Sequence, residues 1–223
     1  RFILGADLFF NDNFVNLMSV MKSAVSKYGK PKVFNFDNGA SYKNKQMELL
    51  AARIGSAINY CQPYTPIQKA KIERWFRTLK DQWMAALDMR DFHTLDELRG
   101  SFLSYVSSYN QHPHSSLKGK TPQERYFSEP ELISRLPDDQ IENSFLLEVE
   151  RRVSADCVIV IDQIEYEVDC RFAKQRITLR YTPDMENIYV VEADGTLTPI
   201  RLLNKQENAS VKRDKVRLTG GED

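Results

Sequence analysis

The first half of the chain alternates between short apolar runs and stretches in which apolar side chains recur at helical spacing. The runs typical of strands are residues 1–10, 32–37 and 57–61, and the helical stretches are residues 13–28, 44–54 and a third from residue 67 onward. Asn11 or Asn13 can cap the first helix, and Gly55 can close the second. This alternation of strands and helices predicts a parallel α/β arrangement.

The helix expected from residue 67 has two distinct faces. An apolar stripe is predicted at Ile72, Phe76, Leu79 and Trp83. A neighbouring face carries Lys69, Glu73, Arg77 and Lys80. One interpretation is a surface helix held by ion pairs between residues four apart. The other is a carboxylate that holds a metal ion among cations that face a phosphodiester.

The second half of the chain changes its hydrophobic period. Thr94 and Glu97 predict a capping box for one more helix, and an acidic, partly helical linker is expected over residues 129–150. From residue 151 to about 205 the period becomes two, which predicts a small all-β barrel, and residues 206–223 form a basic tail that we expect to be flexible.

Composition limits the classes of partner and compartment. Among 223 residues, 31 basic and 31 acidic side chains cancel, so any affinity for DNA must come from local patches such as residues 61–80, with five basic residues and one acidic. No apolar run is long enough to span a membrane. The odd number of cysteines, without paired spacing, favours a reduced cytoplasmic protein over a disulfide scaffold.

Two motifs carry a resemblance to a known family. An apolar run ends in Asp37-Asn38-Gly39, and 35 residues separate Asp37 from Glu73 in the sequence Lys-Ile-Glu-Arg. This pattern resembles the second half of the D,D-35-E motif of the retroviral integrase and transposase superfamily, and most closely that of bacterial insertion-sequence transposases. The resemblance covers about residues 1–128, where a Tyr-Asn … Pro-His … Thr-Pro segment from Tyr109 also looks like the family. It continues more weakly to about residue 205, which is similar to the C-terminal β-barrel of Mu-type transposases.

The resemblance implies a ribonuclease-H-like core that lacks its first two strands, followed by the small barrel. It implies that Asp37 and Glu73 are catalytic residues and ligands of two Mg²⁺ or Mn²⁺ ions. The family's first aspartate lies on a strand before Arg1, and Asp7 is expected to be an ordinary strand residue. Two hypotheses follow: the chain as given is catalytically inactive, and its sheet is incomplete, so that Ile3 and the aromatic residues of strand 32–37 lack partners.

The DNA contacts implied by this resemblance lie around the two carboxylates. Phosphate contacts are expected from Lys69, Lys71, Arg74, Arg77 and Lys80, and contacts to the target strand or terminal base from Asn38 and Tyr64. Structural roles are equally open as alternatives to these DNA contacts: a turn role for Asn38, packing for Tyr64, and a solvated helix face for Lys71 and Arg74. Trp75 and Trp83 are expected in the core.

The resemblance also predicts partners and leaves alternatives. It implies a transposase that joins element ends to target DNA, acts as a homo-oligomer in the full protein, uses accessory transposition proteins, and works in the bacterial cytoplasm without membrane contact. A non-catalytic DNA-binding or assembly protein derived from a transposase is the alternative, and a ribonuclease-H-like nuclease is a third. His112 and His114 suggest a turn packed on the core rather than a zinc site, which needs four ligands.

Overall fold

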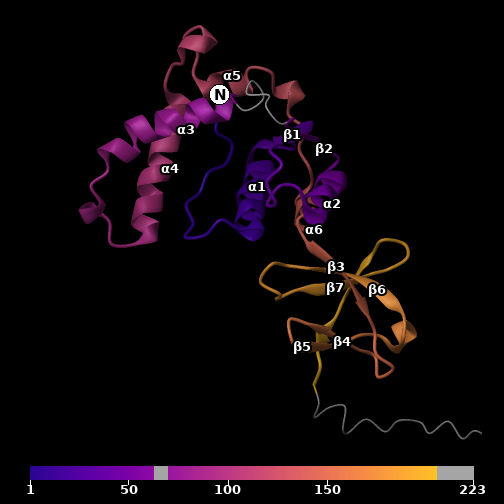
Figure 1. The fold of residues 1–223 in the computed structure, drawn as a ribbon. Helices are drawn as coiled ribbons and strands as arrows, with labels where there is room; N and C mark the ends of the chain where they lie inside the picture. Colours follow the sequence, from indigo (N-terminus) through magenta and orange to yellow (C-terminus); the bar gives the residue numbers. More distant parts are fainter. Residues whose placement is uncertain (63–69, 205–223) are drawn as a thin grey trace, which may run out of the picture. The chain divides into compact units, whose positions relative to one another are not determined.

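The structure is a computed structural model that describes residues 1–62 and 70–204 (Figure 1). The chain divides into two compact units, Arg1–Leu146 and a second unit that begins at Leu147, and each is described by itself. The predicted α/β class of the first part and the β class of the last part are both confirmed. Segment 129–150 spans the division, because it contains both a helix of the first unit and the start of the first strand of the second.

The first unit combines helices with one short parallel strand pair. Its elements are α1 (Phe14–Tyr28), β1 (Val33–Phe36), α2 (Lys45–Ile54), β2 (Ala57–Tyr60), α3 (Ala70–Gln82), α4 (Leu95–Gln111), α5 (Pro122–Phe127) and α6 (Asp138–Ser144), with short 3₁₀ turns between the later helices. Asn13 rather than Asn11 caps α1, and Gly55 ends α2 in the left-handed region at φ 70°. The predicted capping box of Thr94 and Glu97 begins α4.

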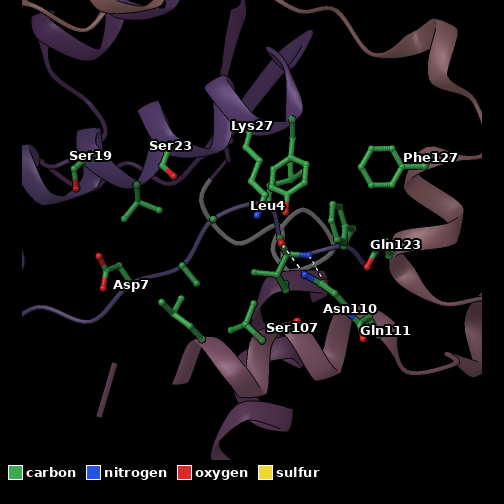
Figure 2. Close-up of a pocket in the computed structure, with 18 residues that line it drawn as sticks. Leu4, Asp7, Ser19, Ser23, Lys27, Ser107, Asn110, Gln111, Gln123 and Phe127 are labelled. Atoms are coloured by element: carbon green, nitrogen blue, oxygen red, sulfur yellow. Dashed lines mark hydrogen bonds between the residues drawn. The ribbon is translucent and has the colours of Figure 1, made fainter. Parts of the chain in front are cut away.

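Residues 1–10 were expected to form a strand, and this prediction is wrong. The segment is assigned no strand, because a strand needs a neighbour with which to exchange backbone hydrogen bonds and the first unit's described residues form only the β1–β2 sheet. Part of the missing ladder is replaced by Asn110 of α4. Its side-chain oxygen accepts from the Ile3 amide at 2.8 Å, and its amide nitrogen donates to the Ile3 carbonyl at 3.0 Å (Figure 2).

The surroundings of residues 2–7 are hollow. A cavity of about 720 Å³ lies along this segment, and Figure 2 shows Ser19, Ser23 and Lys27 of α1 on one side of it and Ser107, Asn110 and Gln111 of α4 on the other. The expectation that Ile3 lacks partners is wrong, because Ile3 packs on the cluster formed by α3 and α4. The aromatic residues of β1 find partners too: Phe34 stacks on Phe36, and Phe36 stacks on Tyr42.

The apolar stripe predicted on α3 is only half correct. Trp75 and Leu79 are buried against Phe102 and Val106 of α4, but Ile72 and Phe76 are 46% and 49% exposed. In the described residues α3 packs against α4, so the part of its surface that is buried is narrower than the apolar pattern in the sequence indicated. The two tryptophans lie in or against this core, as predicted, and Trp83 donates from Nε1 to the hydroxyl of Ser101 at 3.1 Å.

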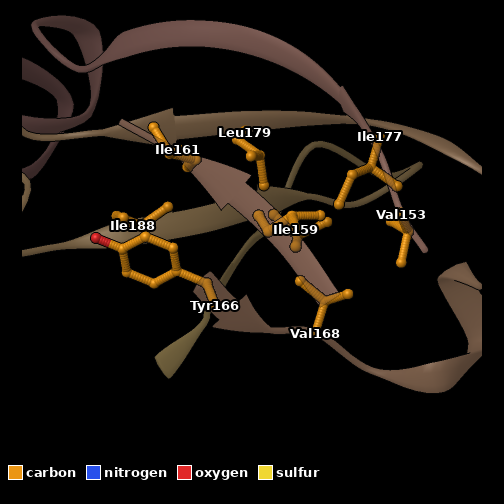
Figure 3. Close-up of a cluster of buried hydrophobic side chains, with 9 residues drawn as sticks. Val153, Ile159, Ile161, Tyr166, Val168, Ile177, Leu179 and Ile188 are labelled. Atoms are coloured by element: carbon orange, nitrogen blue, oxygen red, sulfur yellow. The ribbon is translucent and has the colours of Figure 1, made fainter. Parts of the chain in front are cut away.

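The second unit is built from two antiparallel sheets. Its strands are β3 (Leu147–Arg152), β4 (Val158–Ile161), β5 (Ile164–Glu167), β6 (Arg176–Tyr181), β7 (Ile188–Val191), β8 (Leu197–Pro199) and β9 (Arg201–Leu202), in the orders β3-β6-β7-β8 and β4-β5-β9. Alternate side chains of both sheets form one core that includes Ile159, Tyr166 and Leu179 (Figure 3). Asp162 and Gln163, both at positive φ, make the tight turn between β4 and β5.

The interpretation of the cysteines as all reduced is also wrong for one pair. Cys157 and Cys170 form a disulfide, with their Cα atoms 5.0 Å apart, whereas Cys61 is buried and free. Cys157 lies just before β4 and Cys170 shortly after β5. The hairpin pairs Val158 with Glu167, so its open end brings the two cysteines together. Spacing along the sequence did not reveal this because the contact depends on the hairpin register.

We expect Asn110→Ala to lower the free energy of unfolding by about 1–3 kcal/mol, because both backbone groups of Ile3 lose their partner at a buried position. Chemical denaturation of the two proteins measures this. Asn59→Ala is the matched control, since Asn59 is exposed and donates only to Asn35, and we expect a change within about 0.5 kcal/mol. Equal effects of the two substitutions would contradict the role given to Asn110.

A thiol count tests the disulfide. In denaturant without a reductant one thiol per chain should react, that of Cys61, and all three should react after reduction. Cys61→Ala should leave no reactive thiol before reduction. Replacing Cys157 and Cys170 together by alanine should destabilise the second unit by about 3 kcal/mol, as expected for a loop of this length. Three reactive thiols before reduction would show that the pair is not bonded.

Candidate functional site

Asp37 follows directly after β1, at the carboxyl end of the strand pair. Its Oδ1 accepts a hydrogen bond from the Gly39 amide at 2.8 Å, so the chain turns back around the carboxylate. A Cβ atom at position 39 would lie 2.8 Å from that same oxygen. Glycine is therefore the residue that lets the Asp-Asn-Gly turn close on the half-buried Asp37 side chain.

Asn38 joins the ends of the two strands. Its side-chain nitrogen donates to the Cys61 carbonyl at 2.9 Å, and the Cys61 amide donates to the Phe36 carbonyl at 2.8 Å. These bonds hold the last residue of β1 beside the residue that follows β2. The turn role that the sequence left open for Asn38 is thus present in the structure, while its contact with DNA stays a prediction.

Glu73 lies in the first turn of α3 and is exposed. Its carboxylate forms neither an ion pair nor a hydrogen bond with any residue in the ranges 1–62 and 70–204. In particular it does not pair with Arg77, so those ranges give no support to the interpretation of α3 as a surface helix held by ion pairs. A carboxylate without a cation partner is electrostatically available to a metal ion.

Four of the predicted DNA contacts lie on the same helix as Glu73. Lys71, Arg74, Arg77 and Lys80 are all exposed on α3, and none is ion-paired within the described part of the chain. Two other predicted contacts, Tyr64 and Lys69, lie outside the described residues. So does the rest of segment 63–69.

Asp7, expected to be an ordinary strand residue, lies on no strand and forms an ion pair with Arg99. Its Oδ1 accepts from Arg99 Nε at 2.5 Å, and Arg99 also contacts Asp96 and the Leu8 carbonyl. The negative charge of Asp7 is therefore neutralised by the guanidinium of Arg99. Asp7 is thereby used in fixing segment 1–8 to α4.

Asp37 and Glu73 supply the oxygen donors that Mg²⁺ and Mn²⁺ prefer, and Mg²⁺ is often held by only one or two carboxylates with water and substrate phosphates as its other ligands. The donor chemistry of the chain thus fits such an ion. Within residues 1–62 and 70–204, however, no cluster of three or more His, Cys, Asp or Glu side chains is placed to hold a metal. Within the same residues no such cluster includes His112 or His114.

Sequence reasoning missed a set of contacts around residue 114. The His114 Nδ1 accepts from the Ser116 amide at 3.1 Å, and Arg1 donates from Nε to the Ser116 hydroxyl at 3.2 Å. Burial, and after it the positive charges of Arg1, the amino terminus and Arg74, lower the pKa of His114. The only sequence signal was the excess of basic residues in this turn, because Arg1 and Ser116 are 115 positions apart.

The middle of this chain is similar to known proteins. Residues 54–122 match the family described as integrase core domain, a range that includes Glu73. Over 188 residues the chain is 27% identical to the transposase for transposon Tn552 of Staphylococcus aureus, and the match covers 76% of this chain and 38% of that protein. The chain therefore spans well under half the length of this relative.

Two solved structures show weaker likeness. The catalytic core domain of BIV integrase is 21% identical, with a TM-score of 0.45, over 55% of this chain and 76% of that one. A chain of the simian T-cell lymphotropic virus intasome, solved in complex with the PP2A regulatory subunit B56 gamma, is 14% identical, with a TM-score of 0.41, over 87% of this chain and 66% of that one. The resemblance to transposase and integrase cores inferred from the motifs is confirmed by the family match and the Tn552 relative. In the described part of the chain no helix is both long and apolar enough to cross a membrane.

Proposed function

We propose that this chain is the catalytic-core part of a transposase, an enzyme that cuts DNA and joins the cut end to a target. The observation that carries the proposal is the placement of its two motif carboxylates. Asp37 is held in a turn at the carboxyl end of a parallel strand pair. Glu73 has no ion-pair partner among the described residues and lies on a helix whose other exposed charges are mostly basic. In α/β proteins, sites gather at that end of the strands.

In this proposal the residues of the chain bind and orient the substrate. A divalent ion bound by Asp37 and Glu73 would supply the charge needed to activate a water or hydroxyl group and to stabilise the leaving oxygen. Lys71, Arg74 and Lys80 place positive charge where the phosphates of the DNA backbone would lie, which positions DNA without reading its sequence. The turn of Asn38 and Gly39 fixes the carboxylate of Asp37 before substrate arrives, so no reordering is needed on binding.

A second candidate is supported by the lack of any three-carboxylate group within residues 1–62 and 70–204. Within the described residues Asp7 is bound to Arg99, and no three-carboxylate group exists. We propose that strand transfer needs a third carboxylate and that this chain by itself does not catalyse it. The competing function is a DNA-binding or assembly protein without catalysis, in which Asp37 and Glu73 have no chemical role.

The remaining features are proposed from the relative's name and the fold. The DNA partners would be the element ends and the target. The protein would act as a homo-oligomer, so that two ends are joined together, with accessory transposition proteins and in the bacterial cytoplasm. The second unit would serve DNA binding or assembly. Its strands carry cross-strand ion pairs such as Arg180 with Glu148 at 3.0 Å.

Joining of a labelled element-end duplex to target DNA, measured with the full-length gene product in Mg²⁺ or Mn²⁺, tests the catalytic role. Asp37→Asn and Glu73→Gln should each lower the joining rate by on the order of a hundredfold or more, because loss of an ion's ligand removes several kcal/mol of transition-state stabilisation.

Asp81→Asn is the matched control for both variants. Asp81 is an exposed carboxylate on the same helix as Glu73, and its replacement should leave the rate within about twofold, as is usual for surface substitutions. Joining that survives in either site variant, with unchanged thermal stability, would favour the non-catalytic DNA-binding protein.

A further inference from the structure

The turn between α4 and α5, residues 112–121, has a fixed backbone and is called here the His-Pro-His turn. The His114 amide donates to the Lys120 carbonyl at 3.0 Å, and the Lys120 amide donates to the Leu117 carbonyl at 3.1 Å. Lys118 and Gly119 take the left-handed conformation at φ 54° and 81°, which lets the chain reverse within these few residues. The bonds close the turn on itself and present Lys118 and Lys120 at its exposed end.

His114 has a defined tautomer in this turn. Its Nδ1 lies 3.1 Å from the Ser116 amide, and because that amide can only donate, Nδ1 must be the acceptor. The ring proton of the neutral imidazole is therefore on Nε2, which has no hydrogen-bond partner among the described residues. Its N–H is thus available to an acceptor outside this chain.

Two other parts of the chain act on the turn. Arg1 reaches it through the hydrogen bond from Nε to the Ser116 hydroxyl at 3.2 Å. The beginning of α3 contributes charge, because after burial and Arg1 the positive charge of Arg74 also lowers the pKa of His114.

The cations gathered here form no ion pairs within the described residues, although the exposed carboxylate of Glu73 lies on α3 between Lys71 and Arg74. The set is Arg1, Lys71, Arg74, Lys118 and Lys120, and in the parts of the chain that the structure describes none of them is in an ion pair. Glu124, the acid that follows the turn, already accepts from the amide of Thr121 as part of the α5 capping box. Like charges held together repel one another, and a bound polyanion relieves that repulsion.

We propose that the His-Pro-His turn is a second DNA-backbone contact, in which Lys118, Lys120 and the Nε2–H of His114 bind phosphates beside those bound by α3. This inference rests on the proposed function and deepens it. A duplex fits because its phosphates form a regular row of negative charge, whereas a single bound phosphate would engage only one or two of these cations. The contact is to the backbone, so it positions DNA without selecting sequence.

The salt dependence of DNA binding by the full chain tests this proposal. Anisotropy of a labelled duplex of arbitrary sequence gives the slope of log affinity against log salt, which changes by about 0.9 for each phosphate that the protein no longer neutralises. Replacing Lys118 and Lys120 together by glutamine should reduce the slope by about 1 to 2 and weaken binding similarly for unrelated sequences. Replacing Lys71 and Arg74 together by glutamine should do the same from the α3 side.

Lys22→Gln is the matched control. It removes one positive charge, but Lys22 is paired with Glu142 at 2.6 Å, so the slope should stay at the wild-type value. Thermal melting confirms that each variant is folded.

If the wild type binds DNA and the slope becomes smaller in the α3 variant but not in the turn variant, the second contact is overturned and the proposed function stands. A slope unchanged in both would also overturn the second contact. No salt-dependent binding by the wild type would overturn both proposals.

Discussion

The parallel pairing of β1 with β2 is the constraint on which the candidate site depends. It sets Phe36 opposite Tyr60, and the Asn38 bond to Cys61 continues this alignment past the ends of both strands. Asp37, the residue after β1, therefore lies at the same end of the sheet as Cys61, the residue after β2. Because side chains alternate along a strand, a slip of one residue would turn these neighbours to the other face of the sheet. Four residues in each strand carry this register, so the hydrogen bonds beyond the strand ends matter for holding it.

The same requirement for backbone partners explains the irregular start of the chain. An extended segment without a neighbouring strand leaves its amides and carbonyls unsatisfied, and this unit answers with side chains instead. Asn110 bonds both backbone groups of Ile3, and Arg99 bonds the Leu8 carbonyl. These contacts tie the segment to α4, so α4 becomes the element on which both α3 and residues 1–8 pack. The cationic turn that follows α4 is joined to the start of this segment by the bond from Arg1 to Ser116.

Local signals in the sequence predicted local structure well, and contacts between distant segments poorly. Caps such as Asn44 and Thr94 were readable because a helix start depends on a few adjacent residues. The strand at residues 1–10 failed because strand formation depends on a neighbour, and the disulfide was missed because it depends on hairpin register. Motif spacing predicted Asp37 as a site residue and Glu73 as a site residue on a helix. The contacts around His114 could not be predicted in this way, because Arg1 lies far from them in the sequence.

Mn²⁺ binding to the full chain tests most directly whether Asp37 and Glu73 form one metal site. Electron paramagnetic resonance measures the free and bound ion without any DNA or catalysis. We expect Asp37→Asn and Glu73→Gln each to weaken Mn²⁺ binding by about tenfold or more, and Asp81→Asn to bind Mn²⁺ like the wild type. The double variant should bind Mn²⁺ more tightly than the product of the two single effects would give, because both substitutions disrupt the same site. Mn²⁺ binding that is unchanged in either single variant, or effects that simply add in the double variant, would show that the two carboxylates do not share an ion.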